Sequence, residues 1–341
     1  MSTQMNSDSN TETGPQPVGP SFPAAVLDRV LDVLVVPGYS AIGPWLRKSW
    51  WPPDPVPFDH QVDIVVTGGS SGLGAASAAG LAALGARVHL VGRSSDRLGT
   101  AAAKIRLQVR DAELVQHEAD ISDLDAVRAL VDTIGADVGS LHGLVHCAGV
   151  LPPERTVTAQ GHEVTFATHV LGPFLLTAGL RPLLQADGAG RVIWVSSGGM
   201  YTAALPADDL EYETGEYKGA TAYARTKRMQ VVLAERLAAA FIQPGDPVVH
   251  SMHPGWAATP GVSGSLPTFG KVTRPILRSA EQGADTIVWL AAAGEPGLST
   301  GRFWHDRRVR PTHYLPWGKD DPDARRRLWN FCLKATGTQL N

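Results

Sequence analysis

Tyr223 and Lys227 are the residues whose types and spacing most directly suggest chemistry. They stand four apart in the stretch TAYARTKRMQ, residues 221–230, which has the composition of a helix. Side chains four apart lie on one helix face, a single turn from each other. A free phenol has a pKa of about 10, and a neighbouring cation lowers that pKa toward neutrality. The pair is therefore a candidate acid and base, unless it is simply an exposed helix pair.

A glycine-rich stretch supplies a candidate cofactor site. TGGSSGLG, residues 67–74, separates a short apolar run from a helical one. Glycines let the backbone approach a ligand closely, and the following helix N-terminus attracts a pyrophosphate. An ordinary turn is the alternative, but its place after a first strand favours dinucleotide binding. The predicted contacts are Gly68, Ser70, Ser71, Gly72, Leu73 and Gly74.

The end of the second predicted strand indicates which dinucleotide binds. VGRSSDR places Arg93 and Ser94 where an NAD-binding protein would carry an acid. A carboxylate there holds the ribose 2′-hydroxyl of NAD, whereas an arginine accommodates the 2′-phosphate of NADP. We therefore expect NADP rather than NAD, and we interpret Arg97 as a solvated helix residue. Asp120, followed by Ile121, would either bond the adenine amino group or cap the next helix.

Strands and helices alternate through most of the chain. The expected strands are 62–68, 87–93, 112–120, 141–149, 191–197, 247–255 and 301–304, and the expected helices are 75–86, 94–110, 122–136, 158–185, 220–242 and 278–293. This alternation predicts an α/β fold of the Rossmann type, a doubly wound parallel sheet with helices on both faces. Its ligand would bind at the carboxyl ends of the strands.

The remaining segments suggest one domain with two appendages. Residues 1–20 are polar and predicted to be disordered, 21–59 form an N-terminal arm, 60–310 the Rossmann domain, and 311–341 a C-terminal tail with a short helix. The tail helix would turn Leu328, Trp329 and Cys332 inward. The amphipathic part of the arm, 21–51, would either lie on a membrane surface or pack on its own domain or on a second subunit. We favour packing, because only Arg47 and Lys48 supply clustered positive charge.

Composition excludes several classes of protein. The net charge of −3 suggests no affinity for nucleic acid, and two distant cysteines, Cys147 and Cys332, suggest a reducing compartment. No run has the length and apolarity of a membrane span, and residues 1–20 do not resemble a secretory signal. We expect a cytoplasmic protein with peripheral membrane contact as the open alternative. His142 and His146 fall on a strand without further ligands, so no metal site is expected.

Five motifs together resemble the short-chain dehydrogenase/reductase (SDR) family. They are TGGSSGLG, HCAG at 146–149, VSS at 195–197, YARTK at 223–227 and HPGWAAT at 253–259, in the family's order over roughly residues 60–305. VSSGGM, SMHPGWAATPGV and SAEQGADTIVWLA are similar to the subgroup of SDR family member twelve. The long gap between VSS and YARTK also resembles the retinol dehydrogenase and protochlorophyllide reductase branch.

The resemblance implies a role for each matching residue. Tyr223 would exchange a proton with the substrate oxygen, Lys227 would lower the phenol pKa and bind the nicotinamide ribose, and Ser197 would hydrogen-bond the substrate carbonyl. Further cofactor contacts would come from Ala148, Gly149, Pro254, Gly255 and Thr259. The implied activity is NADP-dependent interconversion of a carbonyl compound and its alcohol, in a protein that forms homo-oligomers.

Two departures from the family pattern bear on this activity. The usual NNAG reads HCAG, so His146 and Cys147 replace two asparagines. His169 stands where the family has an asparagine that holds a water linking the catalytic lysine to solvent. A histidine can also relay protons, because its pKa lies near neutrality. We expect a working enzyme; the alternative is a weakened one that acts as a nucleotide-binding sensor or interaction protein.

The substrate side of the predicted cleft is apolar. The available residues are Met200, Tyr201, Leu205, Trp256, Val262, Leu266 and Phe269. Ligand pockets of this composition suit a hydrophobic carbonyl or alcohol better than a sugar. The acidic insert DDLEYETGEY, 208–217, would either cover this cleft or form a solvated loop.

Overall fold

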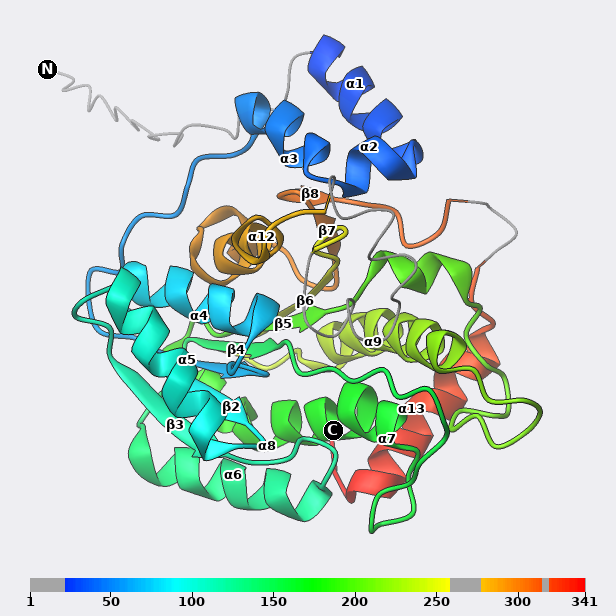
Figure 1. Ribbon diagram of the computed structural model, residues 1–341. Helices are drawn as coiled ribbons and strands as arrows, with labels where there is room; N and C mark the ends of the chain where they lie inside the picture. Colours follow the sequence, from blue (N-terminus) through cyan, green and yellow to red (C-terminus); the bar gives the residue numbers. More distant parts are fainter. Residues whose placement is uncertain (1–21, 258–276, 315–318, 341) are drawn as a thin grey trace, which may run out of the picture.

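The computed structural model describes residues 22–257, 277–314 and 319–340. Its centre is an eight-stranded sheet in the order β3-β2-β1-β4-β5-β6-β7-β8 (Figure 1). The strands are β1 (Asp63–Thr67), β2 (Arg87–Gly92), β3 (Leu114–Glu118), β4 (Gly143–His146), β5 (Arg191–Val195), β6 (Val248–Met252), β7 (Phe303–His305) and β8 (Arg308–Val309). Strands β1 to β7 pair in parallel, which confirms the predicted fold class; the short β8, antiparallel to β7, was not expected.

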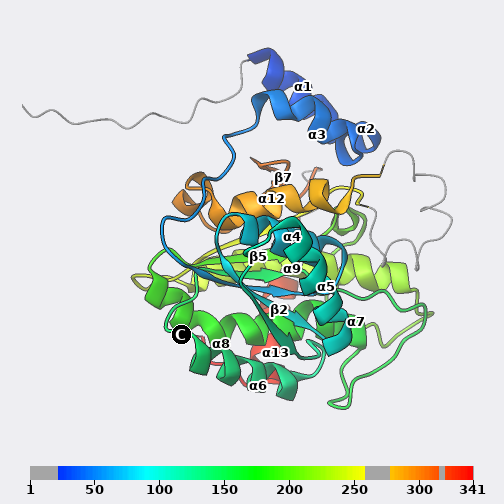
Figure 2. The same ribbon diagram turned by 60° about the vertical axis from the view of Figure 1, so that its left-hand side comes forward.

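Helices cover both faces of the sheet (Figures 1 and 2). One face carries α4 (Gly72–Ala83), α5 (Ser95–Gln108) and α12 (Ala280–Ala292), and the other carries α6 (Leu124–Asp137), α8 (Gly172–Asp187), α9 (Gly219–Ala240) and α13 (Pro322–Thr336). Strand side chains alternate between the two faces, so each face has its own apolar core. Val65 and Leu144 belong to one core, whereas Ile64 and Val145 belong to the other.

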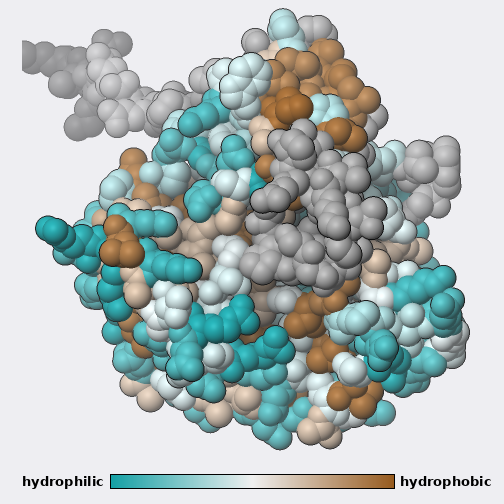
Figure 3. All heavy atoms as spheres, in the orientation of Figure 1, coloured by the Kyte–Doolittle hydropathy of each residue, from teal (hydrophilic) through white to brown (hydrophobic). Residues whose placement is uncertain are grey.

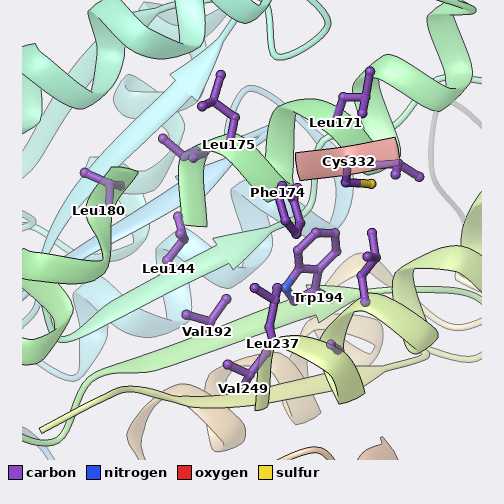
Figure 4. Close-up of a cluster of buried hydrophobic side chains, with 14 of the residues drawn as sticks. Leu144, Leu171, Phe174, Leu175, Leu180, Val192, Trp194, Leu237, Val249 and Cys332 are labelled. Atoms are coloured by element: carbon purple, nitrogen blue, oxygen red, sulfur yellow. The ribbon is translucent and has the colours of Figure 1, made fainter. Parts of the chain in front are cut away.

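The core on the α8 side is built around Trp194 and Phe174 (Figure 4). Leucines and valines from β4, β5, β6 and α9 surround these two rings. The tail helix α13 closes this core with Leu328, Trp329 and Cys332, which are all buried, as the sequence predicted. The tail is therefore part of the folded domain and stabilises it by removing apolar surface from water.

The long helix expected over 158–185 begins later than predicted. Residues 158–163 instead form a turn at Gly161, whose φ is +85°, followed by Glu163. The Glu163 carboxylate accepts hydrogen bonds from the backbone N–H groups of Thr165 and Phe166, so it caps α7 (Val164–Phe166). A π-helical turn, Ala167–Leu171, then leads into α8 and carries His169.

The N-terminal arm packs on its own domain. It consists of α1 (Phe22–Val33), α2 (Val35–Tyr39), α3 (Ile42–Arg47) and a 3-10 turn, Lys48–Trp50, beside the β7–β8 edge of the sheet (Figure 1). Buried ion pairs attach it: Arg47 bonds both Asp28 of the arm and Asp306 of the domain, at 2.8 and 2.6 Å. Arg310 of the domain also bonds Asp28, at 2.8 Å. The arm therefore packs on its own domain, which is one of the alternatives that the sequence left open.

Candidate active site

A cleft lies where the strand order reverses between β1 and β4, at the carboxyl ends of the strands. Loops from neighbouring parallel strands diverge at such a point and leave a crevice. The cleft has a volume of about 460 Å³ and reaches from the glycine-rich turn to α9. Its lining includes the predicted residues Gly68, Ser70, Ser71, Gly72, Leu73, Gly74, Arg93, Ser94, Asp120, Ile121, Ala148, Gly149, Ser197, Tyr223, Lys227, Pro254 and Gly255. Thr259 lies outside the described residues.

The glycine-rich turn has the tight geometry that a dinucleotide site needs. Gly68 has φ +70°, and a Cβ there would lie 2.9 Å from the Cα of Ala148. A Cβ on Gly74 would lie 2.3 Å from the carbonyl oxygen of Gly68. Helix α4 begins at Gly72, so its free N–H groups lie at the cleft wall. These residues fit the pyrophosphate of a dinucleotide.

Two arginines line the cleft on the side of the glycine-rich turn. Arg93 directly follows β2, as predicted, and Arg97 Nη2 lies 3.5 Å from Ser71 Oγ of that turn. The interpretation of Arg97 as only a solvated helix residue was therefore incomplete. Ser94 caps α5 by accepting a hydrogen bond from the N–H of Arg97, which brings the Arg97 side chain to the cleft edge.

Asp120 remains at this end of the cleft and does not cap the next helix. Asp123 caps α6, accepting hydrogen bonds from the N–H groups of Asp125 and Ala126. Asp120 instead accepts hydrogen bonds from the backbone and hydroxyl of Ser122, at 2.9 and 2.8 Å. Its second carboxylate oxygen lies 4.0 Å from Arg93 Nη1. Asp120 therefore does not cap α6, and its bond to the adenine amino group stays a prediction.

Ser197, Tyr223 and Lys227 come together at the other end of the cleft. Ser197 follows β5, whereas Tyr223 and Lys227 lie one turn apart on α9. Ser197 Oγ and the Tyr223 ring approach one point of the cleft, since a Cβ at Gly199 would lie 3.6 Å from Ser197 Oγ and 4.0 Å from Tyr223 Cε1. The Lys227 Nζ lies 5.3 Å from the centre of the Tyr223 ring. A hydroxyl, a phenol and an amine thus face one cavity with the glycine-rich turn.

The titration of this group differs from the sequence expectation. Burial raises the pKa of Tyr223, and the Ser197 hydrogen bond offsets only part of that rise. The Lys227 Nζ donates hydrogen bonds to Val195 O and Gln230 Oε1, at 3.0 and 3.1 Å. Burial lowers the pKa of Lys227 itself to about 7. At neutral pH the phenol therefore keeps its proton, as a proton donor must.

His169 is buried against this group and both of its ring nitrogens have partners. Nε2 accepts a hydrogen bond from the N–H of Val150 at 3.0 Å, so the ring proton resides on Nδ1. Nδ1 then donates to Thr226 Oγ1 at 2.8 Å. Burial, with the charge of Lys227, holds the pKa of His169 well below its usual range. The imidazole is therefore neutral in this structure.

His146 and Cys147, which stand where the family has two asparagines, make structural contacts. His146 Nε2 lies 2.8 Å from Thr177 Oγ1, and its ring packs against Trp194. The backbone N–H of Cys147 donates to Thr67 Oγ1 at 3.1 Å, and burial raises the pKa of its thiol to about 12. Within the described ranges, no three potential metal ligands gather in one place.

The substrate end of the cleft is partly apolar. Trp256, Leu151, Leu277 and Thr202 line it. A neighbouring groove of about 470 Å³ shares Thr202, Ala220 and Ala224 with the cleft, and its other lining residues are Ala203, Ala204, Leu205, Pro206, Thr221 and Arg225. Met200 is fully buried beneath, and Tyr201 donates to the Pro311 carbonyl. Val262, Leu266 and Phe269 lie outside the described residues.

The acidic insert 208–217 is attached beside the cleft. Glu211 accepts hydrogen bonds from the Glu163 N–H and pairs with His162, at 2.7 and 2.9 Å. No residue of the insert is among those that line the cleft in the described structure. Its contacts therefore favour an anchored loop over a cover.

The N-terminal arm also contacts the cleft walls. The Tyr39 carbonyl accepts hydrogen bonds from the Trp256 N–H and from Arg278 Nε, at 2.7 and 3.0 Å. The Tyr39 ring packs on Gly198, next to Ser197; a Cβ at Gly198 would lie 2.8 Å from that ring. Tyr39 is far from Gly198 and Trp256 along the chain, so no local sequence pattern predicted either contact.

These features define a nucleotide-binding oxidoreductase, and comparison with known proteins identifies the family. Residues 63–207 match the family model described as short chain dehydrogenase. The human protein "Dehydrogenase/reductase SDR family member 12" is 41% identical over 271 residues, covering 76% of this chain and 83% of the relative. Human "Retinol dehydrogenase 12" is 29% identical, covering 80% and 86%. The chain belongs to the short-chain dehydrogenase/reductase family and is an oxidoreductase, as its motifs predicted.

Solved structures show the same fold at lower identity. A crystal structure of a protein from Mycobacterium paratuberculosis has a TM-score of 0.67 and 24% identity, covering 84% of this chain and 97% of that one. A short chain dehydrogenase from Escherichia coli CFT073, complexed with NADPH, has a TM-score of 0.61 and 23% identity, covering 75% and 100%.

Proposed function

We propose that this protein reduces a hydrophobic carbonyl compound to its alcohol with NADPH. The placement of Ser197, Tyr223 and Lys227 in the same cleft as the glycine-rich turn is the observation that carries the proposal. The apolar lining at the substrate end supports a hydrophobic substrate. Two similar proteins support this substrate class and cofactor. One relative is named for retinol, an apolar alcohol, and one structural neighbour is complexed with NADPH.

The bound nicotinamide would supply the hydride; the chain supplies binding and proton transfer. The glycine-rich turn would hold the pyrophosphate, Arg93 the 2′-phosphate, and Lys227 the nicotinamide ribose. The Ser197 hydroxyl would bond the substrate carbonyl oxygen and orient it toward Tyr223. Tyr223 would then protonate that oxygen as negative charge develops on it. Its raised pKa keeps it protonated beforehand.

Two measurements test this function. Titration of the protein with NADPH, followed by cofactor fluorescence, reports binding. A panel of hydrophobic aldehydes and ketones, assayed by loss of NADPH absorbance, reports turnover. We expect saturable binding and turnover of at least one apolar carbonyl. NADPH binding without turnover across a broad panel would instead support the nucleotide-binding sensor.

Arg93 is expected to determine the choice of cofactor. Arg93→Ala removes the cation at the end of β2, and a charge-assisted bond to phosphate contributes about 1.5–3 kcal/mol. We expect NADPH affinity to fall roughly tenfold or more, with little change for NADH. Calorimetric titration of both cofactors measures this. Arg106→Ala, an exposed change on α5 away from the cleft, is the control; a wild-type preference for NADH would contradict the assignment.

We further propose that the outer face of the arm contacts a membrane surface. Large apolar side chains gather there (Figure 3). Trp45 is 76% exposed, and the others are Val26, Leu27, Val30, Leu34, Val36 and Ile42. The acids Asp28 and Asp32 are buried on the inner side, whereas Arg29 and Lys48 are exposed. An exposed apolar face on an arm that also exposes the cations Arg29 and Lys48 suits an interface with anionic lipid. No helix in the described ranges is long and apolar enough to cross a bilayer.

Vesicle sedimentation tests this contact. Binding to vesicles with anionic lipid should exceed binding to neutral vesicles, and Trp45→Ser should reduce it at least threefold. Leu107→Ser, an equally exposed apolar residue on α5, is the control and should have no effect. If the arm face instead joins two copies of the chain, sedimentation velocity will show a dimer that Trp45→Ser dissociates, and the membrane proposal is wrong.

A further inference from the structure

A buried side-chain amide connects Lys227 to the residue that replaces the family asparagine. Gln230 lies one turn beyond Lys227 on α9 and is fully buried. Its Oε1 accepts a hydrogen bond from Lys227 Nζ at 3.1 Å. Its Nε2 donates to the backbone carbonyl of His169 at 2.9 Å. The two ends of one amide therefore bridge the catalytic amine and the π-helical turn.

The His169 side chain takes no part in this bridge. Its ring nitrogens bond the Val150 N–H and the Thr226 hydroxyl, as described above. Thr226 Oγ1 in turn donates to the Tyr223 carbonyl at 2.9 Å. The imidazole thus joins the loop after β4, the π-helical turn and α9, and only the His169 backbone faces Gln230. This arrangement gives the ring a supporting role and leaves contact with Lys227 to Gln230.

We propose that Gln230 is a positioning residue for Lys227, whose Nζ it holds in a fixed direction through the bridge to the His169 carbonyl. His169 then orients α9 and does not carry the proton. The inference rests on the proposed reductase activity for its kinetic consequence, but the bridge itself is a property of the protein without substrate.

The hydrogen-bond capacity of the amine explains why an amide is suited to this position. A lysine ammonium has three donors, and an amide oxygen accepts without carrying charge. Val195 O and Gln230 Oε1 take two of the donors, which leaves one directed to a cofactor or substrate. Losing the Gln230 acceptor would release Nζ from one of its two fixed directions. A misplaced catalytic group can lower the rate by about a hundredfold.

The other titratable groups that face Lys227 are neutral. Burial raises the pKa of Cys147 to about 12, holds that of His169 well below its usual range, and raises that of Tyr223. Among the described residues, no carboxylate acts on the Lys227 charge. A carboxylate introduced at position 230 would stabilise the ammonium, so the pKa of Lys227 would rise.

Two substitutions at position 230 test the proposal. Gln230→Met keeps the side-chain length and removes both hydrogen bonds, so we expect kcat to fall at least tenfold with a smaller change in KM. In Gln230→Glu, the apparent pKa of any limb of the pH–rate profile that reports Lys227 should rise by at least one pH unit. Thr177 on α8 forms a buried hydrogen bond with His146. Thr177→Val removes that bond, so it controls for lost stability and should leave kcat unchanged within about twofold.

A spectroscopic titration makes the test independent of turnover. The 13Cε resonance of Lys227, assigned from a Lys227→Arg spectrum, reports protonation of the amine in the cofactor-free protein. We expect a midpoint near the value of about 7 in the wild type and a rise of at least one unit in Gln230→Glu. An unchanged midpoint in Gln230→Glu, or unchanged kcat in Gln230→Met, overturns the proposal. A shifted midpoint in a protein that reduces no carbonyl leaves the bridge standing and disproves the reductase function instead.

Discussion

Tyr223→Phe is expected to lower kcat for carbonyl reduction roughly a thousandfold. A positioned general acid contributes about 10²–10⁴ in rate, and phenylalanine keeps the ring while removing the only proton that this side chain can donate. The ring of Tyr223 packs against His169 at 5.4 Å, a contact that phenylalanine preserves. NADPH affinity should change by less than about threefold, because the glycine-rich turn and Arg93 lie at the other end of the cleft.

Stopped-flow measurement of NADPH oxidation, with fluorescence titration of the cofactor, checks this expectation. Tyr217→Phe is a suitable control, since that phenol bonds Glu163 outside the cleft lining. Its activity should stay within about twofold of the wild type. Undiminished turnover in a folded Tyr223→Phe protein would mean that another group protonates the substrate, and the assignment of the acid would be wrong.

Asp306→Asn is expected to destabilise the protein by about 3–5 kcal/mol, because it removes the negative charge from a buried cluster of cations. The carboxylate bonds Arg278 at 2.6 Å and Arg47 at 2.6 Å, and all three side chains are almost fully buried. Asparagine has the same shape and tolerates the φ of +49° found at this position. The substitution therefore isolates the charge. Urea unfolding monitored by circular dichroism measures the change.

An exposed ion pair provides the control for this substitution. Asp323 pairs with Arg326 on the surface of α13, and Asp323→Asn should change the free energy of unfolding by less than about 1 kcal/mol. If Asp306→Asn costs no more than that, the buried cluster does not hold the arm in place. Arg278 also bonds the Tyr39 and Pro254 carbonyls, so loss of Asp306 should loosen the Trp256 wall of the cleft as well.

The pH dependence of stability has a definite sign at Asp306. Burial alone would raise the pKa of this carboxyl, but Arg278, His305 and Arg47 hold it below its usual range. A carboxyl with a lower pKa in the folded than in the unfolded state stabilises the protein above the unfolded pKa. Its contribution is then lost as the pH falls below the ordinary carboxyl range. Asp306→Asn should accordingly be less sensitive to acid than the wild type.

Local sequence patterns were sufficient for the fold and for the cofactor side of the site. The glycine-rich turn, Arg93 and the Tyr223–Lys227 spacing are each properties of one short segment, and their geometry follows from the strand or helix that contains them. Short apolar runs and helical patterns alternated clearly enough to predict a doubly wound sheet with its ligand cleft at the strand ends. The parallel order then brought Ser197 beside Tyr223 without further information.

Contacts between distant segments were decided only by the tertiary structure. The pKa of Tyr223 depends on its burial, and Gln230 could be recognised only once His169 lay beside it. The docking of Tyr39 against Gly198 and Trp256 depends on charges at Asp28, Arg278 and Asp306 that are far apart in the chain. Spacing along a sequence reports which residues share one helix or strand, whereas burial and pairing depend on which elements pack together, and no local pattern contains that.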